Sequence, residues 1–144
     1  MEVLSLARSL EKPLEVLKME NNYPGGKVRY IENGLGVKLP ENYRLALQNY
    51  PFPKFAKSTG WSLWDQPFRI VEATGFYRNM KYARWPENLL CIGDDGDCCP
   101  YALDLNDGSV SKVYKGNLMK LMERYESFDD FMEEVEADYR ELPP

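Results

Sequence analysis

The sequence predicts an α+β fold, in which an antiparallel sheet of about five or six strands has helices at its N-terminal end and one closing C-terminal helix. Three observations predict it. Apolar residues recur at helical spacing through the first third of the chain, short apolar or alternating runs separated by turn signals fill the middle, and a capped amphipathic stretch follows near the end. At 144 residues, the chain is expected to form a single domain over residues 1–144.

The N-terminal part is predicted to be helical. Residues 2–19 carry apolar side chains at helical spacing. A short helix is expected over residues 28–35, with Gly34 and Gly36 closing it. The segment Leu39-Pro40-Glu41 predicts the start of another helix, because proline is favoured at the first helical position.

Strands are expected from residue 62 onward. Residues 62–64 and 68–71 are short strand candidates, in a segment that is rich in aromatic and β-branched residues. Residues 89–92 form an apolar run, and residues 101–105 alternate apolar and polar side chains. The two runs flank a turn rich in glycine and aspartate, which predicts a strand, a turn and a second strand.

A hairpin and a helix are predicted to complete the domain. Asn106-Asp107-Gly108 is typical of a tight hairpin turn, so residues 109–115 should return beside the preceding strand. Ser127 then caps the closing helix, with Asp130 as the acid of a capping box. The apolar residues of that helix form one stripe: Phe128, Phe131, Met132, Val135 and Tyr139.

The acidic turn is the most distinctive candidate site. Asp94, Asp95 and Asp97 lie close together, and no basic residue is near them in the sequence. An EF-hand calcium loop needs alternating acids, a glycine at its sixth position and a glutamate at its twelfth, and this turn lacks that pattern. A magnesium site would need acids converging from separate strands. Aspartate and glycine also suit tight turns for local reasons, so we expect an exposed acidic edge that shares one face with Glu72 or Trp64 and holds no metal.

Composition argues against several classes of function. The chain has no histidine, which removes the commonest general base and zinc ligand, so we expect no catalytic residue and no cofactor. A net charge of −5 argues against a nucleic-acid partner, although the aromatic and basic run at residues 76–85 could stack bases. The sequence has no apolar stretch of membrane-spanning length and no clear signal peptide, and its cysteine count is odd. These features predict a cytoplasmic protein with no membrane partner.

Three sequence blocks, in order, resemble the SUKH superfamily. They are a short helix followed by Leu-Pro-x-x-Tyr at residues 31–43, a strand, Gly-Asp-Asp-Gly turn and strand at residues 85–105, and a last strand and closing helix at residues 108–131. That superfamily includes yeast regulators of cell-wall assembly and many bacterial immunity proteins. The chain departs from it at Cys98-Cys99, where the family often has a further glycine, and matches poorly at residues 61–82.

The resemblance implies a non-enzymatic protein that binds another protein. The first expectation is a bacterial immunity protein, or antitoxin, that neutralises a polymorphic toxin, often a nuclease, by covering its active site. The alternative is a regulatory or scaffolding protein of cell-wall (glucan) assembly. An acidic protein can occupy the basic cleft of a nuclease as a phosphate mimic. The residues expected to contact the partner are Asp94, Asp95, Asp97, Trp64, Glu72 and Trp85.

Overall fold

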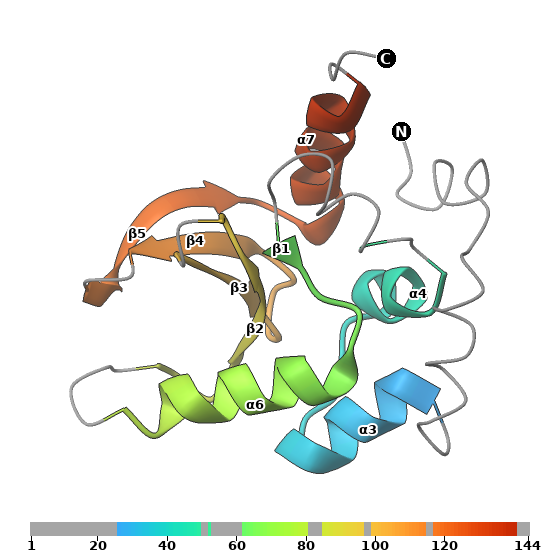
Figure 1. Ribbon diagram of the computed structural model, residues 1–144, viewed down its shortest axis with the longest axis vertical. Helices are drawn as coiled ribbons and strands as arrows, with labels where there is room; N and C mark the ends of the chain where they lie inside the picture. Colours follow the sequence, from blue (N-terminus) through green and yellow to red (C-terminus); the bar gives the residue numbers. More distant parts are fainter. Residues whose placement is uncertain are drawn as a thin grey trace.

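A five-stranded antiparallel sheet in the order β1-β2-β3-β4-β5 forms the centre of the computed structural model (Figure 1). The structure describes residues 26–49, 52, 62–80, 85–96, 99–114 and 117–140. The strands are β1 (Ser62–Leu63), β2 (Leu89–Asp94), β3 (Pro100–Asp104), β4 (Val110–Tyr114) and β5 (Asn117–Tyr125). The helices are α3 (Gly26–Leu35), α4 (Glu41–Asn49), α6 (Pro67–Arg78) and α7 (Phe128–Arg140). The predicted α+β fold is therefore confirmed.

The two predicted helices between residues 26 and 49 are confirmed as α3 and α4. Gly36 follows α3 with a φ of 64°, a left-handed conformation that favours glycine after a helix. Lys27 in α3 is buried, and its Nζ lies 3.2 Å from Oδ2 of Asp65, which is also buried. This ion pair fixes α3 to the segment just before α6. The helix expected over residues 2–19 lies outside the described residues.

The strand expected at residues 68–71 is wrong, because this segment is the start of α6. Gln66 is extended, with φ −85° and ψ 111°, and Pro67 then occupies the first turn of the helix. Ile70 and Thr74 are buried one turn apart, whereas Phe68 is exposed. A four-residue apolar run fits a helix as well as a strand, and the proline before it was the stronger signal.

The predicted strand–turn–strand and hairpin are both present. β2 pairs with β3, and β3 pairs with β4, each antiparallel. Around the second turn, the Ser109 carbonyl accepts a hydrogen bond from the Asp104 backbone N–H at 2.8 Å. Gly108 has a φ of 78°, which this tight turn requires. The strand predicted at residues 62–64 is confirmed in part by β1.

β5 is a strand that the sequence analysis did not predict. Its leucine, methionine, lysine and glutamate residues do not favour strands over helices. It forms because β4 supplies a hydrogen-bonding edge, with Val110 opposite Tyr125 and Lys112 opposite Glu123. Two register shifts interrupt the pairing, so the strand is irregular.

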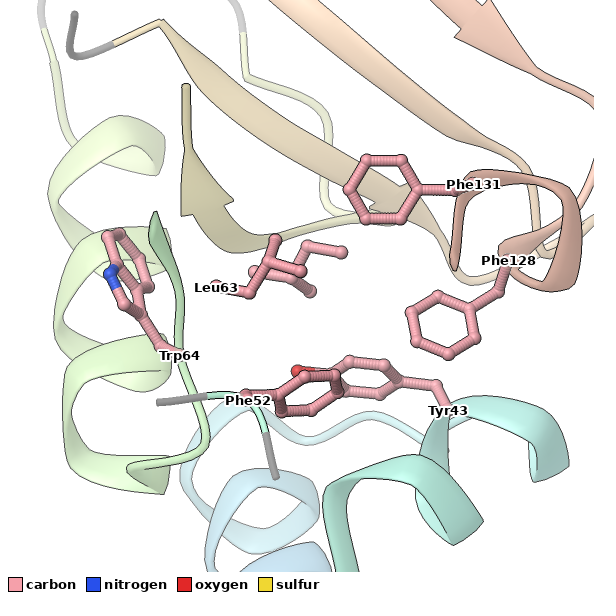
Figure 2. A pocket seen from close by; sticks show the side chains of 7 residues that line it. Tyr43, Phe52, Leu63, Trp64, Phe128 and Phe131 are labelled. Carbon is pink, nitrogen blue, oxygen red and sulfur yellow. The ribbon is translucent and has the colours of Figure 1, made fainter. Parts of the chain in front are cut away.

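The main core lies between one face of the sheet and the helices α3, α4 and α7, and Ile70 of α6 also belongs to it. Ser127 caps α7 as predicted, with its Oγ accepting a hydrogen bond from the Asp130 N–H at 3.1 Å. The stripe residues Phe128, Phe131, Met132 and Val135 are buried, and the side chain of Tyr139 lies outside the described residues. Figure 2 shows aromatic side chains around a narrow internal space that is too small for a water molecule.

The opposite face of the sheet has a smaller core. Trp85 is buried there with Cys91, Ala102 and Val113, and Tyr77 of α6 packs against them. The rings of Tyr77 and Trp85 stack with their centroids 4.9 Å apart. Of the helices in the described ranges, none is both long and apolar enough to cross a membrane.

Candidate functional site

The acidic turn lies between β2 and β3, and its first two aspartates are held by the backbone. Oδ1 of Asp94 accepts a hydrogen bond from the Gly96 N–H at 2.9 Å. Oδ1 of Asp95 accepts one from the Cys99 N–H at 3.1 Å, while the Asp95 N–H donates to the Cys99 carbonyl. These bonds fix both carboxylates, as short polar side chains often do in turns. Asp97 lies outside the described residues.

Neither Asp94 nor Asp95 is fully exposed, although the sequence analysis expected an exposed edge. Asp94 is half-buried, and the Asp95 side chain is 16% exposed. Lys112 of β4 explains part of this, because its Nζ lies 3.6 Å from Asp95 Oδ2 and 3.6 Å from Glu123 Oε1. Lys112 is far from Asp95 along the chain, so no local sequence pattern predicts this contact.

Trp64 lies next to the acid-bearing end of β2. Its backbone N–H donates to the Ile92 carbonyl at 3.0 Å, and its Nε1 donates to Oγ of Ser62, the residue paired with Asp94. The Trp64 ring is half-buried, and the Arg69 guanidinium lies 4.7 Å from its centroid. A cation over an indole face is a favourable contact. Trp64 is therefore linked to Asp94 through Ser62, and Arg69 lies over its ring.

Gly93 allows β1 to lie this close to β2. A Cβ at this position would collide with the Ser62 carbonyl oxygen. The glycine of the Gly-Asp turn therefore has a packing role: it lets the two backbones meet and places Trp64 beside the turn.

Glu72 and Trp85 are placed differently from each other. Glu72 is exposed on α6, one turn after Arg69. Trp85 is 6% exposed, and its Nε1 donates a hydrogen bond to the Leu89 carbonyl at 2.9 Å. Its large ring therefore contributes mainly to the smaller core.

Cys91 lies on β2, in the smaller core. It is a free thiol, fully buried, and burial raises its pKa to about 12. A thiol with such a pKa stays protonated near neutral pH, so it is a poor nucleophile. Its backbone N–H donates to the Thr74 hydroxyl at 2.9 Å, which joins β2 to α6.

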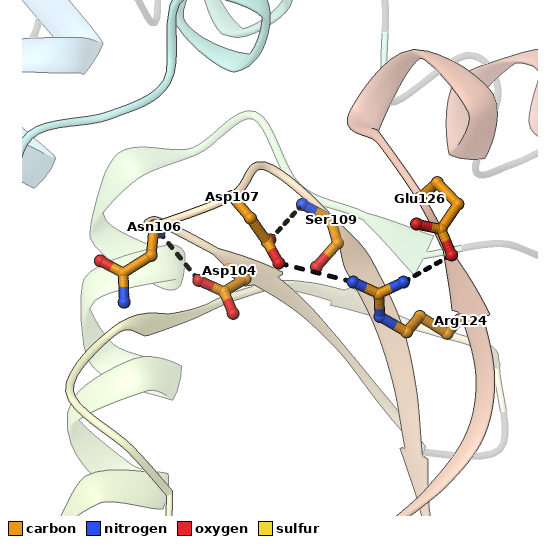
Figure 3. A network of polar contacts seen from close by, with 6 residues as sticks. All are labelled: Asp104, Asn106, Asp107, Ser109, Arg124 and Glu126. Atoms are coloured by element: carbon orange, nitrogen blue, oxygen red, sulfur yellow. Dashed lines mark hydrogen bonds and ion pairs between the residues drawn. The ribbon is translucent and has the colours of Figure 1, made fainter.

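The other end of the sheet carries a second polar network, at the turn between β3 and β4 (Figure 3). Oδ1 of Asp107 accepts from the Ser109 N–H at 2.8 Å, and Asp107 Oδ2 lies 3.4 Å from Arg124 Nη2. Arg124 also contacts Glu126, at 2.6 Å. Hydrogen bonds from Ser109, followed by the charge of Arg124, lower the pKa of Asp107. The residues Asn106-Asp107-Gly108 predict this turn but no function for it.

The two ends of the sheet thus present fixed carboxylates, one set beside an aromatic ring and a guanidinium. Such groups suit contact with a charged partner. Within the described ranges, no three histidine, cysteine, aspartate or glutamate side chains gather as a metal site would require.

Comparison with known proteins identifies one family. The model of the SMI1 / KNR4 family (SUKH-1) matches residues 27–134. That range is well over half of the chain and runs from α3 into α7, so it includes all five strands and both turns. No curated protein matches the chain.

Proposed function

Because the chain belongs to the SMI1 / KNR4 family (SUKH-1), we propose that it is a non-enzymatic protein-binding module, and specifically a bacterial immunity protein that neutralises a basic toxin by direct binding. Family membership alone does not define a function, because one fold hosts many functions. The finer proposal therefore depends on the chemistry of the surface.

The acidic turn beside Trp64 is the observation that carries this proposal. Asp94 and Asp95 are held by backbone hydrogen bonds before any partner arrives. A surface that is already ordered loses little conformational freedom on binding. The aromatic ring of Trp64 adds a residue type that is enriched at protein interfaces.

The charge of the protein supports a basic partner. The net charge is −5, and nuclease clefts that bind phosphate are basic. Acidic residues at the rim of an interface mainly accelerate association by long-range attraction. Lys112 neutralises part of the charge of Asp95, so Asp94 is expected to contribute more of this attraction than its neighbour.

The test is binding to the product of the neighbouring gene, which the immunity role predicts to be a toxin. We expect Asp94→Asn with Asp95→Asn to slow association about three- to tenfold at low salt and to flatten its salt dependence. Asparagine keeps the Oδ1 acceptor of each turn bond, so the fold should persist. The matched control is Glu87→Gln with Glu133→Gln, which removes the same charge from two exposed positions elsewhere.

Each result has a distinct meaning. Equal association rates and salt slopes for the two double variants would show that the aspartates only shape the turn. Failure of the wild-type protein to bind the neighbouring gene product would contradict the immunity role. Recovery of cell-wall assembly proteins instead would favour the alternative, a regulatory or scaffolding role in cell-wall assembly.

A further inference from the structure

A groove of about 420 Å³ lies where the start of α4, the β3–β4 turn and the start of α7 meet. It is separate from the acidic turn, because the β2–β3 and β3–β4 turns are at opposite ends of the sheet. Its lining combines two kinds of residue, apolar at the base and polar or acidic around the opening.

The apolar part of the lining comes from three segments. Pro40 precedes α4, Leu105 follows β3, and Phe128 opens α7. Phe128 is 2% exposed and is held by an edge-on contact with Tyr43, with ring centroids 5.3 Å apart. Phe128 belongs to the main core and Leu105 packs against it, so this part of the base is firmly supported.

The acidic part comes from Glu41 and Asp107, both exposed. Asp129 adds a third carboxylate beside the lining, because its Oδ2 accepts a hydrogen bond from Asn42 Nδ2 at 3.0 Å. Arg124 lies close to Asp107, but Glu126 shares its charge. Among the residues that the structure describes, no lysine or arginine lines the groove.

The partial positive charges at the N-termini of two helices offset part of this negative charge. α4 and α7 both begin at the groove, and each N-terminus is equivalent to roughly half a positive charge. Together they offset about one unit of charge, whereas Glu41, Asp107 and Asp129 carry three carboxylates. The groove therefore remains anionic overall and favours a cation.

We propose that this groove binds a lysine or arginine side chain from a basic segment of a partner protein. Such a side chain has an apolar stem and a charged head, which match the apolar base and the acidic opening. The inference deepens the proposed function and rests on it only for the identity of the partner, a basic toxin. The groove would supply a second contact, on a different side of the domain from the acidic turn.

The experiment is an amide chemical-shift titration of the whole protein with a hexa-arginine peptide. Its control is a hexa-citrulline peptide, which has the same shape without the charge. We expect the arginine peptide alone to shift the amides of Asn106, Gly108 and Ser127 in a saturable way. Shifts confined to Asp94–Gly96, or equal shifts with citrulline, would overturn the proposal.

A charge-removing variant tests the acidic opening directly. Glu41→Gln with Asp107→Asn should weaken peptide binding about two- to thirtyfold, because two rim charges are lost. Asparagine at position 107 keeps the Oδ1 acceptor for the Ser109 N–H, so the turn should persist. Equal weakening by Glu87→Gln with Glu133→Gln would show that only net charge matters and would overturn the site.

Three further outcomes test the site, and the last two separate this inference from the proposed function. Spermidine producing the same shifts as the peptide would identify a general cation site and contradict a side-chain pocket. Toxin binding that is unaffected by Glu41→Gln with Asp107→Asn would remove the groove from the interface but leave the immunity role standing. Peptide binding at the groove without toxin binding would support the groove as a binding site for basic side chains but contradict the immunity role.

Discussion

Phe131 offers the sharpest test of the core. It is fully buried on α7. Its ring centroid lies 4.9 Å from that of Tyr101 on β3 and 5.2 Å from that of Tyr125 on β5. Replacing it with alanine removes the ring that joins the closing helix to two strands. The lost volume would extend the narrow space that Phe131 already borders (Figure 2).

The expected cost can be estimated from these contacts. Truncating a buried phenylalanine to alanine costs about 3–5 kcal/mol. Each aromatic pair adds about 0.5–1.5 kcal/mol beyond buried area, and Phe131 makes at least two close pairs, so we expect the upper half of that range. Since domains are stable by only about 5–15 kcal/mol, the variant should fold but with little margin.

The assay is urea unfolding followed by circular dichroism, with Phe76→Ala as the matched control. Phe76 has the same side chain but is 63% exposed on α6, so its loss should change stability by less than about 0.5 kcal/mol. With m between about 1 and 3 kcal/mol/M, Phe131→Ala should lower the midpoint by more than about 1 M. Equal midpoints for the two variants would refute the placement of α7 against the sheet.

Three further predictions concern the backbone, a thiol and an ion pair. Gly93→Ala should detach β1 and lower the melting temperature. Gly75→Ala should do neither, because a Cβ there faces open space. Amide exchange in β1 should be faster in the first variant and unchanged in the second. Folding raises the pKa of Cys91 from 9.0 to about 12. The free energy of unfolding should therefore be unaffected by this thiol below pH 9 and fall between pH 9 and 12. Cys91→Ala should reduce this dependence on pH in urea titrations. Lys27→Met should cost about 3–5 kcal/mol in calorimetry by leaving Asp65 buried and unpaired, and adding Asp65→Leu should recover part of it.

Local signals were enough to predict most elements of this fold. Pro40 and the Ser127 cap are short-range features that specify helix starts, and Asn106-Asp107-Gly108 specifies a turn through the left-handed conformation of its glycine. Residues 68–71 were misassigned because a short apolar run has no period of its own. β5 was missed because its pairing with β4, rather than its composition, makes it a strand.

The candidate site was less predictable for the same reason. The aspartates of the β2–β3 turn could be found in the sequence, but the cation that faces Asp95 comes from β4, and the cation over Trp64 comes from α6. Cross-strand register and the path of α6 decide both contacts. The groove likewise joins three segments that are far apart in the chain, so no local pattern marks it.

The strand order has a consequence for the way the domain folds. From β2 to β5, each strand pairs with the next one along the chain, so each pairing closes only a short loop. Contacts of this kind form quickly, since contact order governs folding rate. β1 differs, because α6 separates it from β2 in sequence. We therefore expect the four-stranded meander to assemble early and β1, with Trp64 behind it, to dock late, so that the surface around the acidic turn is completed only in the last stage of folding.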